Sequence, residues 1–69
     1  MRISIDTGGT FTDLVCEDKK NKLKIFKVPT TSENPSIGIL NGLKQIATSY
    51  KKNFTDFLSD IDTIIHGTT

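Results

Sequence analysis

The sequence predicts a small α/β fold, with a mixed four-stranded sheet and one main helix on one face. Three segments have strand character and are separated by short polar turns, at residues 1–5, 11–16 and 22–28, which is typical of an antiparallel meander. Apolar residues then recur at three- and four-residue steps through residues 36–50, as in an amphipathic helix. A fourth strand pattern follows at residues 62–66. A strand reached through a helix normally runs parallel to its neighbour by a right-handed crossover, so we expect the strand order 3-2-1-4.

Alternating side chains identify the strands of the meander. In the first strand, Ile3 and Ile5 alternate with polar residues, which predicts one buried and one solvated face. In the third strand, we expect Leu23, Ile25 and Phe26 to find cover in the core.

The main helix begins near a proline and has one apolar face. Pro35 follows a polar connector and suits a first helical turn. Gly38 and Gly42 each lower helix propensity by about 1 kcal/mol relative to alanine. Close approach of the helix to the sheet would explain both glycines, as would simple tolerance. The apolar face comprises Ile37, Leu40, Leu43, Ile46, Ala47 and Tyr50.

A short helical segment and a final strand complete the pattern. Phe54, Phe57 and Leu58 indicate a second, short helical turn. Ile64 and Ile65 are adjacent apolar residues in the last strand, which predicts burial on both faces of the sheet.

Length and charge restrict the classes of function. The chain has 69 residues, nine basic and eight acidic, with a formal net charge of +1. We expect a single partial domain over residues 1–69, with no electrostatic surface for nucleic acid or an anionic membrane. The lysine runs at 19–22 and 51–52 are interpreted as solvated faces. No stretch approaches the roughly 20 apolar residues of a membrane span, so a cytoplasmic protein is expected. Cys16 has no companion cysteine and is expected to be a buried strand thiol.

Residues 6–10, which we call the glycine hairpin, have the strongest chemical signal. The sequence Asp-Thr-Gly-Gly-Thr places one carboxylate, two hydroxyls and two glycines at the tip between the first two strands. Consecutive glycines allow positive φ and let backbone N–H groups converge on an anion such as phosphate. Asp6 can orient a magnesium ion, directly or through water, while the threonine hydroxyls donate to phosphate oxygens. The alternative is a structural Gly-Gly turn capped by Asp6.

The last residues are expected to lie beside the glycine hairpin. Parallel pairing makes the carboxyl ends of the first and fourth strands coincide, at the edge where open α/β sheets bind ligands. For Asp13, a hydrogen-bonded structural role is an equally natural explanation, and for a single histidine at a strand end, such as His66, a structural role is the more common one. The candidate substrate contacts and supporting groups at this edge are Asp13, His66, Gly67, Thr68 and Thr69.

Four segments together resemble the N-terminal region of the hydantoinase/oxoprolinase family. They are Ile-Asp-Thr-Gly-Gly-Thr-Phe-Thr-Asp at 5–13, Lys-Val-Pro-Thr-Thr at 27–31, the helix start at 35–43 and Ile-His-Gly-Thr-Thr at 65–69. That family includes ATP-dependent N-methylhydantoinase A subunits, 5-oxoprolinase and acetone carboxylase β subunits, and is similar to actin-like and sugar-kinase-like ATPases. The resemblance implies a fragment of an actin-like ATPase (ribonuclease H-like) domain from a chain of several hundred residues.

The resemblance also implies a hydrolase that uses ATP and Mg²⁺ to activate a cyclic amide. By position, Asp6 would align Mg²⁺-bound water, Thr7 would support the loop, and Gly8, Gly9 and Thr10 would hold the transferred phosphoryl group. An acetone carboxylase-type β subunit and a sugar-kinase-like phosphotransferase are the alternatives, because the first motif is shared across the superfamily. The implied partners are a cyclic amide substrate, the rest of the parent chain and a second large subunit. The isolated segment is expected to be inactive and to self-associate through its uncovered sheet.

Two other classes of protein fit parts of the sequence. Asp-Thr-Gly after an apolar strand also opens the active-site loop of aspartic proteases, but those half-enzymes are nearly all β, whereas this chain has a central helix. A non-catalytic interaction module would bind a partner through its helix face or sheet edge. Nucleotide binding separates the enzyme from the module, and peptide cleavage would identify a protease.

Overall fold

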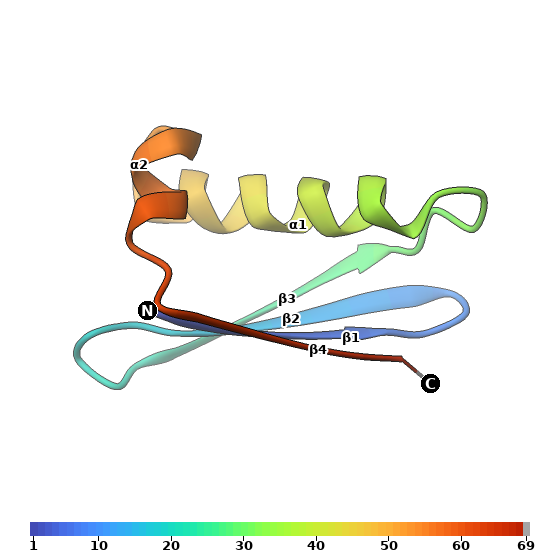
Figure 1. Ribbon diagram of the computed structural model, residues 1–69, viewed down its shortest axis with the longest axis horizontal. Coiled ribbons are helices and arrows are strands. Elements are labelled where there is room, and N and C mark those ends of the chain that lie inside the picture. Colours follow the sequence, from blue (N-terminus) through green and yellow to red (C-terminus); the bar gives the residue numbers. More distant parts are fainter. Residues whose placement is uncertain (69) are drawn as a thin grey trace.

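A computed structural model describes residues 1–68 as one twisted sheet with two helices over one of its faces (Figure 1). The strand order is β3-β2-β1-β4, antiparallel within β1, β2 and β3 and parallel between β1 and β4. This confirms the predicted α/β fold and strand order. Neither helix in the described range is long and apolar enough to cross a membrane. The elements are β1 (Arg2–Thr7), β2 (Phe11–Glu17), β3 (Leu23–Pro29), α1 (Pro35–Ser49), α2 (Phe54–Ser59) and β4 (Thr63–Thr68).

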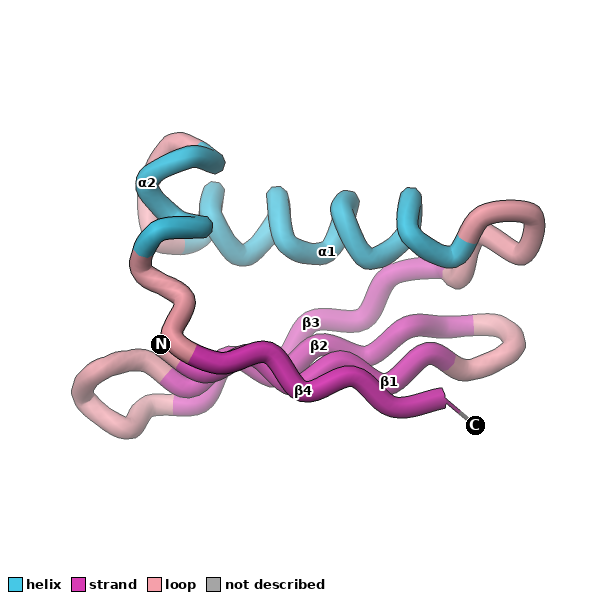
Figure 2. The backbone as a smooth tube through the Cα atoms, viewed as in Figure 1, coloured by secondary structure: helices cyan, strands magenta, loops and turns pink. Residues whose placement is uncertain are grey.

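The two faces of the sheet differ in what covers them. Both helices lie on one side, which we call the helix face, and no element of residues 1–68 lies on the other, the open face (Figure 2). Side chains alternate between these faces, so Ile3 and Ile5 of β1 are buried on the helix face while Ser4 is exposed on the open face. The core joins the sheet to both helices and includes Ile3, Leu14, Cys16, Val28, Leu43, Ile46, Ala47 and Phe57.

The start of α1 is fixed by side-chain hydrogen bonds. The Asn34 side chain accepts a hydrogen bond from the Ser36 N–H at 3.2 Å, and Pro35 occupies the first turn as expected. The Thr31 hydroxyl donates to the Asn34 carbonyl oxygen at 2.5 Å and accepts from the Gly38 N–H at 2.9 Å. The residues just after β3 therefore set where the helix begins.

Both helix glycines face the sheet, which confirms close approach as their explanation. A Cβ atom on Gly42 would lie 2.5 Å from Cδ1 of Leu14, and one on Gly38 would lie 3.1 Å from the Pro29 carbonyl oxygen. Because the glycines occupy the centre of the contact, the buried stripe of α1 is rotated from the expected apolar face. Ile37 and Leu40 are consequently about half exposed.

Two predictions of burial are wrong. Leu23 and Ile25 are 61% and 74% exposed on the open face, because the register of β3 with β2 turns Phe26 and Val28 toward the core instead. Ile64 and Ile65 are 50% and 49% exposed, because β4 is an edge strand and α1 packs on β3 and β2.

Candidate functional site

The strands extend further into the glycine hairpin than the sequence suggested. β1 continues through Asp6 and Thr7, whose Cα partners in β2 are Asp13 and Thr12. Only residues 8–10 are left to make the turn. Asp6 is therefore held by sheet pairing, with its position fixed on both sides by β2 and β4.

The turn does not use the left-handed backbone that two glycines permit. No glycine in the described part of the chain has a positive φ, so Gly8 and Gly9 leave this freedom unused. The Gly8 N–H closes the turn by donating to the Phe11 carbonyl oxygen at 2.9 Å. A Cβ atom on Gly9 would meet no atom within 4 Å. Glycine at this position therefore leaves open space beside the backbone, which a ligand can approach closely.

Thr30, just after β3, ties the glycine hairpin to the rest of the sheet. Its N–H donates to the Thr10 carbonyl oxygen at 2.9 Å, and its hydroxyl donates to the Gly8 carbonyl oxygen at 2.8 Å. The same hydroxyl lies 2.9 Å from that of Thr12, which is fully buried. In the sequence, Thr30 belongs to a polar connector and to one of the family-like segments, and neither gave it a role at the hairpin. The available signal was its position directly after a strand that pairs with β2, which brings it back beside the hairpin.

Two carboxylates are neighbours across β1 and β2. Asp6 and Asp13 are Cα partners, and directly opposite residues of an antiparallel pair project from the same face, with Cβ atoms about 4.5–5.5 Å apart. Like charges in such a pair are destabilising unless another charge offsets them. Lys27 of β3 supplies part of that charge, with its Nζ 3.9 Å from Oδ1 of Asp13.

One oxygen of this pair has no hydrogen-bond donor. Oδ1 of Asp13 is buried and accepts no hydrogen bond from residues 1–68. The Lys27 ammonium is close enough to act as a charge but too distant for a hydrogen bond. A buried, unpartnered carboxylate oxygen beside a second carboxylate is a suitable ligand for a divalent cation.

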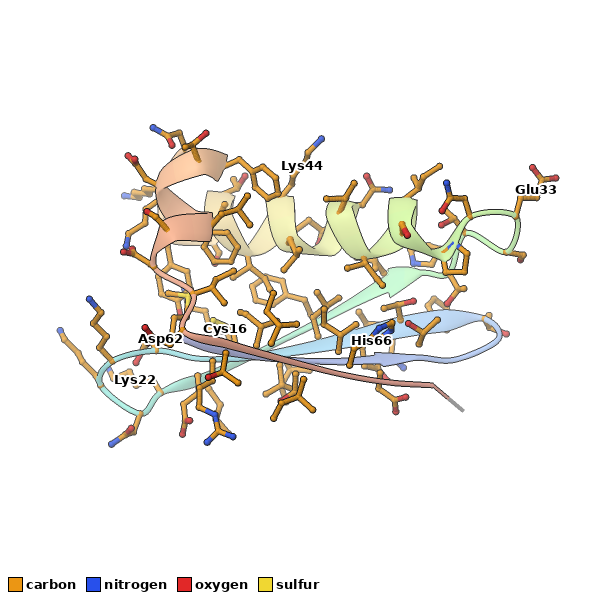
Figure 3. All side chains as sticks on the ribbon, in the orientation of Figure 1. Cys16, Lys22, Glu33, Lys44, Asp62 and His66 are labelled. Carbon is orange, nitrogen blue, oxygen red and sulfur yellow. The ribbon has the colours of Figure 1, made fainter. Side chains whose placement is uncertain are left out.

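His66 lies on the opposite face from this carboxylate pair. It is the register partner of Ile5, and its Nε2 atom lies 3.0 Å from the Thr7 hydroxyl oxygen. Figure 3 shows His66 toward the hairpin end of the sheet. The imidazole is exposed, so it is not a buried structural histidine. It can donate to or accept from the Thr7 hydroxyl, depending on its tautomer.

The remaining candidate residues follow the same strand. Gly67 is the register partner of Asp6, and a Cβ atom there would meet nothing within 4 Å. Thr68 pairs with Thr7 through the β4 backbone. Thr69 lies outside the described residues. The structure thus brings Gly67 beside the carboxylate pair, as parallel pairing predicted.

The site therefore combines an exposed glycine turn with a pair of carboxylates. No group of three or more His, Cys, Asp or Glu side chains that could hold a metal is found in residues 1–68. Mg²⁺ does not require one, because it usually binds one or two carboxylates together with waters and substrate phosphates. The features of this edge that a ligand or cation could contact are therefore the open backbone beside Gly9 and the facing carboxylates of Asp6 and Asp13.

Comparisons with known proteins agree with the motifs. The profile of the hydantoinase/oxoprolinase N-terminal region matches residues 2–69, which confirms the resemblance found in the sequence. The alpha subunit of caprolactamase from Pseudomonas jessenii is 40% identical over 68 residues, which make up 99% of this chain and 10% of that protein. The gamma subunit of acetophenone carboxylase from Aromatoleum aromaticum is 39% identical over 67 residues, 97% of this chain and 9% of that protein. The chain spans about a tenth of the length of these relatives.

Proposed function

The chain belongs to the hydantoinase/oxoprolinase N-terminal region family, and from this membership we propose that it forms one wall of an ATP site in a larger enzyme that activates cyclic amides. The observation that carries the proposal is the pairing of Asp6 with Asp13 directly below the glycine turn. Two facing carboxylates destabilise a sheet, so a role for their charge accounts for them better than a structural turn does.

In this proposal, Asp6 and Asp13 hold Mg²⁺, and residues 7–10 contact the phosphate groups of ATP. Two observations support the fit. The buried Oδ1 of Asp13 lacks a hydrogen-bond donor, and the space beside Gly9 is open to a phosphate oxygen. When bound, Mg·ATP would supply the phosphoryl group that activates the substrate, and the protein would contribute positioning and charge neutralisation. The hydrogen bonds of Thr30 would keep the turn in one conformation for this purpose.

The same proposal assigns residues 1–69 to the N-terminal part of an actin-like ATPase (ribonuclease H-like) domain. Its support is the order of the elements: an antiparallel meander, a crossover helix and a parallel fourth strand, with a carboxylate at the end of the first strand. The hydrogen bond between the His66 ring and the Thr7 hydroxyl gives His66 a positioning role, because the imidazole fixes the hydroxyl that precedes the glycines.

A cyclic amide is the substrate class that we favour. The caprolactamase subunit is a relative over nearly the whole chain, and its name refers to a cyclic amide. The second candidate is carboxylation of a ketone. The acetophenone carboxylase subunit supports this candidate, because it is nearly as similar to this chain, at 39% identity, as the caprolactamase subunit. We expect phosphate release by the full-length protein with caprolactam, hydantoin or 5-oxoproline. If release instead requires acetophenone and bicarbonate, the carboxylase function replaces the hydrolase function.

The decisive variants remove charge and keep shape. Asp6→Asn in the full-length protein is expected to lower kcat for Mg·ATP-dependent turnover by about 100-fold. Asp13→Asn is expected to lower it by about tenfold, with a higher Mg²⁺ requirement. Neither change should lower the melting temperature, because each relieves repulsion between the two carboxylates.

The matched control is Glu33→Gln, an equal charge change at an exposed position in the connector before α1. It is expected to leave turnover and melting temperature unchanged. Near wild-type turnover in Asp6→Asn, together with a lower melting temperature, would show instead that Asp6 is a structural cap of the turn.

A further inference from the structure

We propose that a hollow at the opposite end of the sheet from the glycine hairpin binds a compact polyanion of the phosphate class. The hollow has a volume of about 450 Å³, within the range typical of small-molecule sites. Figure 3 shows Lys22 at this end of the sheet and His66 toward the other. The residues that form its basic wall and its floor are Lys19, Lys20, Lys22, Lys24, Lys52 and Tyr50.

Segments far apart in the chain bring their positive charge together here. The turn between β2 and β3 contributes three lysines, β3 a fourth, and the loop after α1 a fifth. The hollow is lined by five of the nine basic residues of the chain but only two of its eight acidic residues. The lysines of both runs are exposed, as the interpretation as solvated faces expected, and the fold brings Lys52 beside the run at 19–22. A concave surface of one charge sign concentrates the field and attracts counterions.

Both acidic residues of the hollow are already engaged. Oδ1 of Asp18 accepts the backbone N–H groups of Lys20 at 2.8 Å and Lys22 at 3.1 Å. These bonds, led by the one from Lys22, hold the pKa of Asp18 below its usual value. Asp60 forms an ion pair with Lys52. Within the described residues, no carboxylate oxygen lies within 4.0 Å of the ammonium groups of Lys19, Lys20 or Lys22. Three ammonium groups thus have no ion-pair partner in the described residues, although Asp18, Asp60 and Asp62 act on Lys19 and Lys22 at longer range.

Side-chain contacts join Lys24, Tyr50 and Asp18 in the lining of the hollow. Nζ of Lys24 lies 4.0 Å from the centroid of the Tyr50 ring, and the Tyr50 hydroxyl donates to Oδ2 of Asp18 at 3.4 Å. Burial of Tyr50 raises its pKa to about 12, so the phenol stays neutral and adds no negative charge. Asn21 adopts a φ of 61°, which fixes the shape of the lysine turn. Such preorganisation lowers the entropic cost of binding.

The geometry favours a compact ligand that is separate from the proposed ATP. Ammonium groups are point-charge partners of phosphate oxygens and can surround a small anion within a hollow. From Arg2 to Thr7, β1 extends about 17 Å at about 3.3 Å per residue. A single phosphate chain at the glycine hairpin would therefore not reach this hollow.

Lysine acylation of the full chain, measured by mass spectrometry, tests the proposal. The probe is inorganic pyrophosphate, and Mg²⁺ is left out. Millimolar pyrophosphate is expected to slow acylation of Lys19, Lys20 and Lys22 by at least ~3-fold over potassium chloride of equal ionic strength. Lys44, which lies outside the hollow on α1, is the internal reference and should be unchanged. Equal rates at all positions would overturn the proposal. Slowing at Lys27 alone would place pyrophosphate at the glycine hairpin and also overturn it.

Matched variants provide a second measurement. Lys22→Gln is expected to weaken pyrophosphate binding about fivefold in calorimetry, corresponding to the loss of one exposed charge contact. Lys44→Gln removes the same charge elsewhere and should change affinity by less than ~2-fold. Equal weakening in both variants would show non-specific attraction. Protection of the three lysines by polyglutamate but not by pyrophosphate would assign the hollow to an acidic protein surface and overturn the small-anion proposal.

Discussion

Replacing Gly42 with alanine tests the packing of α1 on the sheet, because two effects of opposite sign compete. In an isolated helix the substitution stabilises by about 1 kcal/mol. In this structure the new Cβ atom would lie 2.5 Å from Cδ1 and 3.0 Å from Cδ2 of Leu14. Leu14 is fully buried between the sheet and the helix, so its side chain has no solvent-filled space into which to move.

The expected change in the free energy of unfolding follows from how closely the new Cβ atom approaches Leu14. Carbon atoms in contact prefer a separation of about 3.5–4.0 Å, so a 2.5 Å approach requires the helix or the leucine to shift. Overpacking of this kind costs about 1–3 kcal/mol, and the short distance places Gly42→Ala near the upper end. After subtracting the propensity gain, we expect the free energy of unfolding to fall by about 2 kcal/mol.

The assay is urea unfolding of the chain at low micromolar concentration, followed by circular dichroism. Gly9→Ala is the matched control and should be nearly neutral, because a Cβ atom there meets nothing within 4 Å. In the double variant Gly42→Ala with Leu14→Ala, the two changes should be less than additive by at least ~1 kcal/mol, because the shorter side chain relieves the overlap. If Gly42→Ala instead stabilises the chain by about 1 kcal/mol, helix propensity alone decides and the close-approach explanation is refuted.

Three further predictions concern other parts of the molecule. Thr30→Val should lower the free energy of unfolding by about 1–3 kcal/mol, because the Gly8 carbonyl and the buried Thr12 hydroxyl lose a partner; unchanged urea unfolding would contradict the role of this hydroxyl. Tyr50 should titrate near pH 12 in ultraviolet absorbance. Since its folded pKa is raised above the unfolded value, its contribution to stability is complete below pH 10 and declines as the pH rises through 12. The chain should self-associate through its open face, where Ile25 is 74% exposed. Ile25→Lys should weaken this association in sedimentation velocity, and a strictly monomeric wild-type chain at high micromolar concentration would argue against it.

Strand order was predictable because it depends on local patterns and a general rule of handedness. Which side chains of β3 face the core was not predictable, because that strand contains two sets of apolar residues that project from opposite faces. Leu23 and Ile25 form one set, and Phe26 and Val28 span the other. Pairing with β2 selects the second set. Lys24 shares its face and places its ammonium group over the Tyr50 ring. Alternation alone carries no information about these tertiary partners.

The candidate site was predictable where its residues are neighbours in sequence or are brought together by regular strand pairing. The motif identified Asp6 and the two glycines, and parallel pairing placed Gly67 beside them. Thr30 was missed because its bonds to the glycine hairpin span about 20 residues. The backbone conformation of the turn was not predictable, because glycine permits a positive φ without requiring it.

Thr30 and Thr31 are adjacent in sequence but hold different elements. Thr30 bonds to the glycine hairpin, whereas Thr31 bonds to the first turn of α1 through the Gly38 N–H. The hairpin tip and the start of the helix should therefore open together, as one cooperative unit in hydrogen exchange. A ligand that stabilises the tip would slow exchange at the Gly38 amide as well. Two neighbouring hydroxyls would thus transmit occupancy of the turn to the first turn of α1.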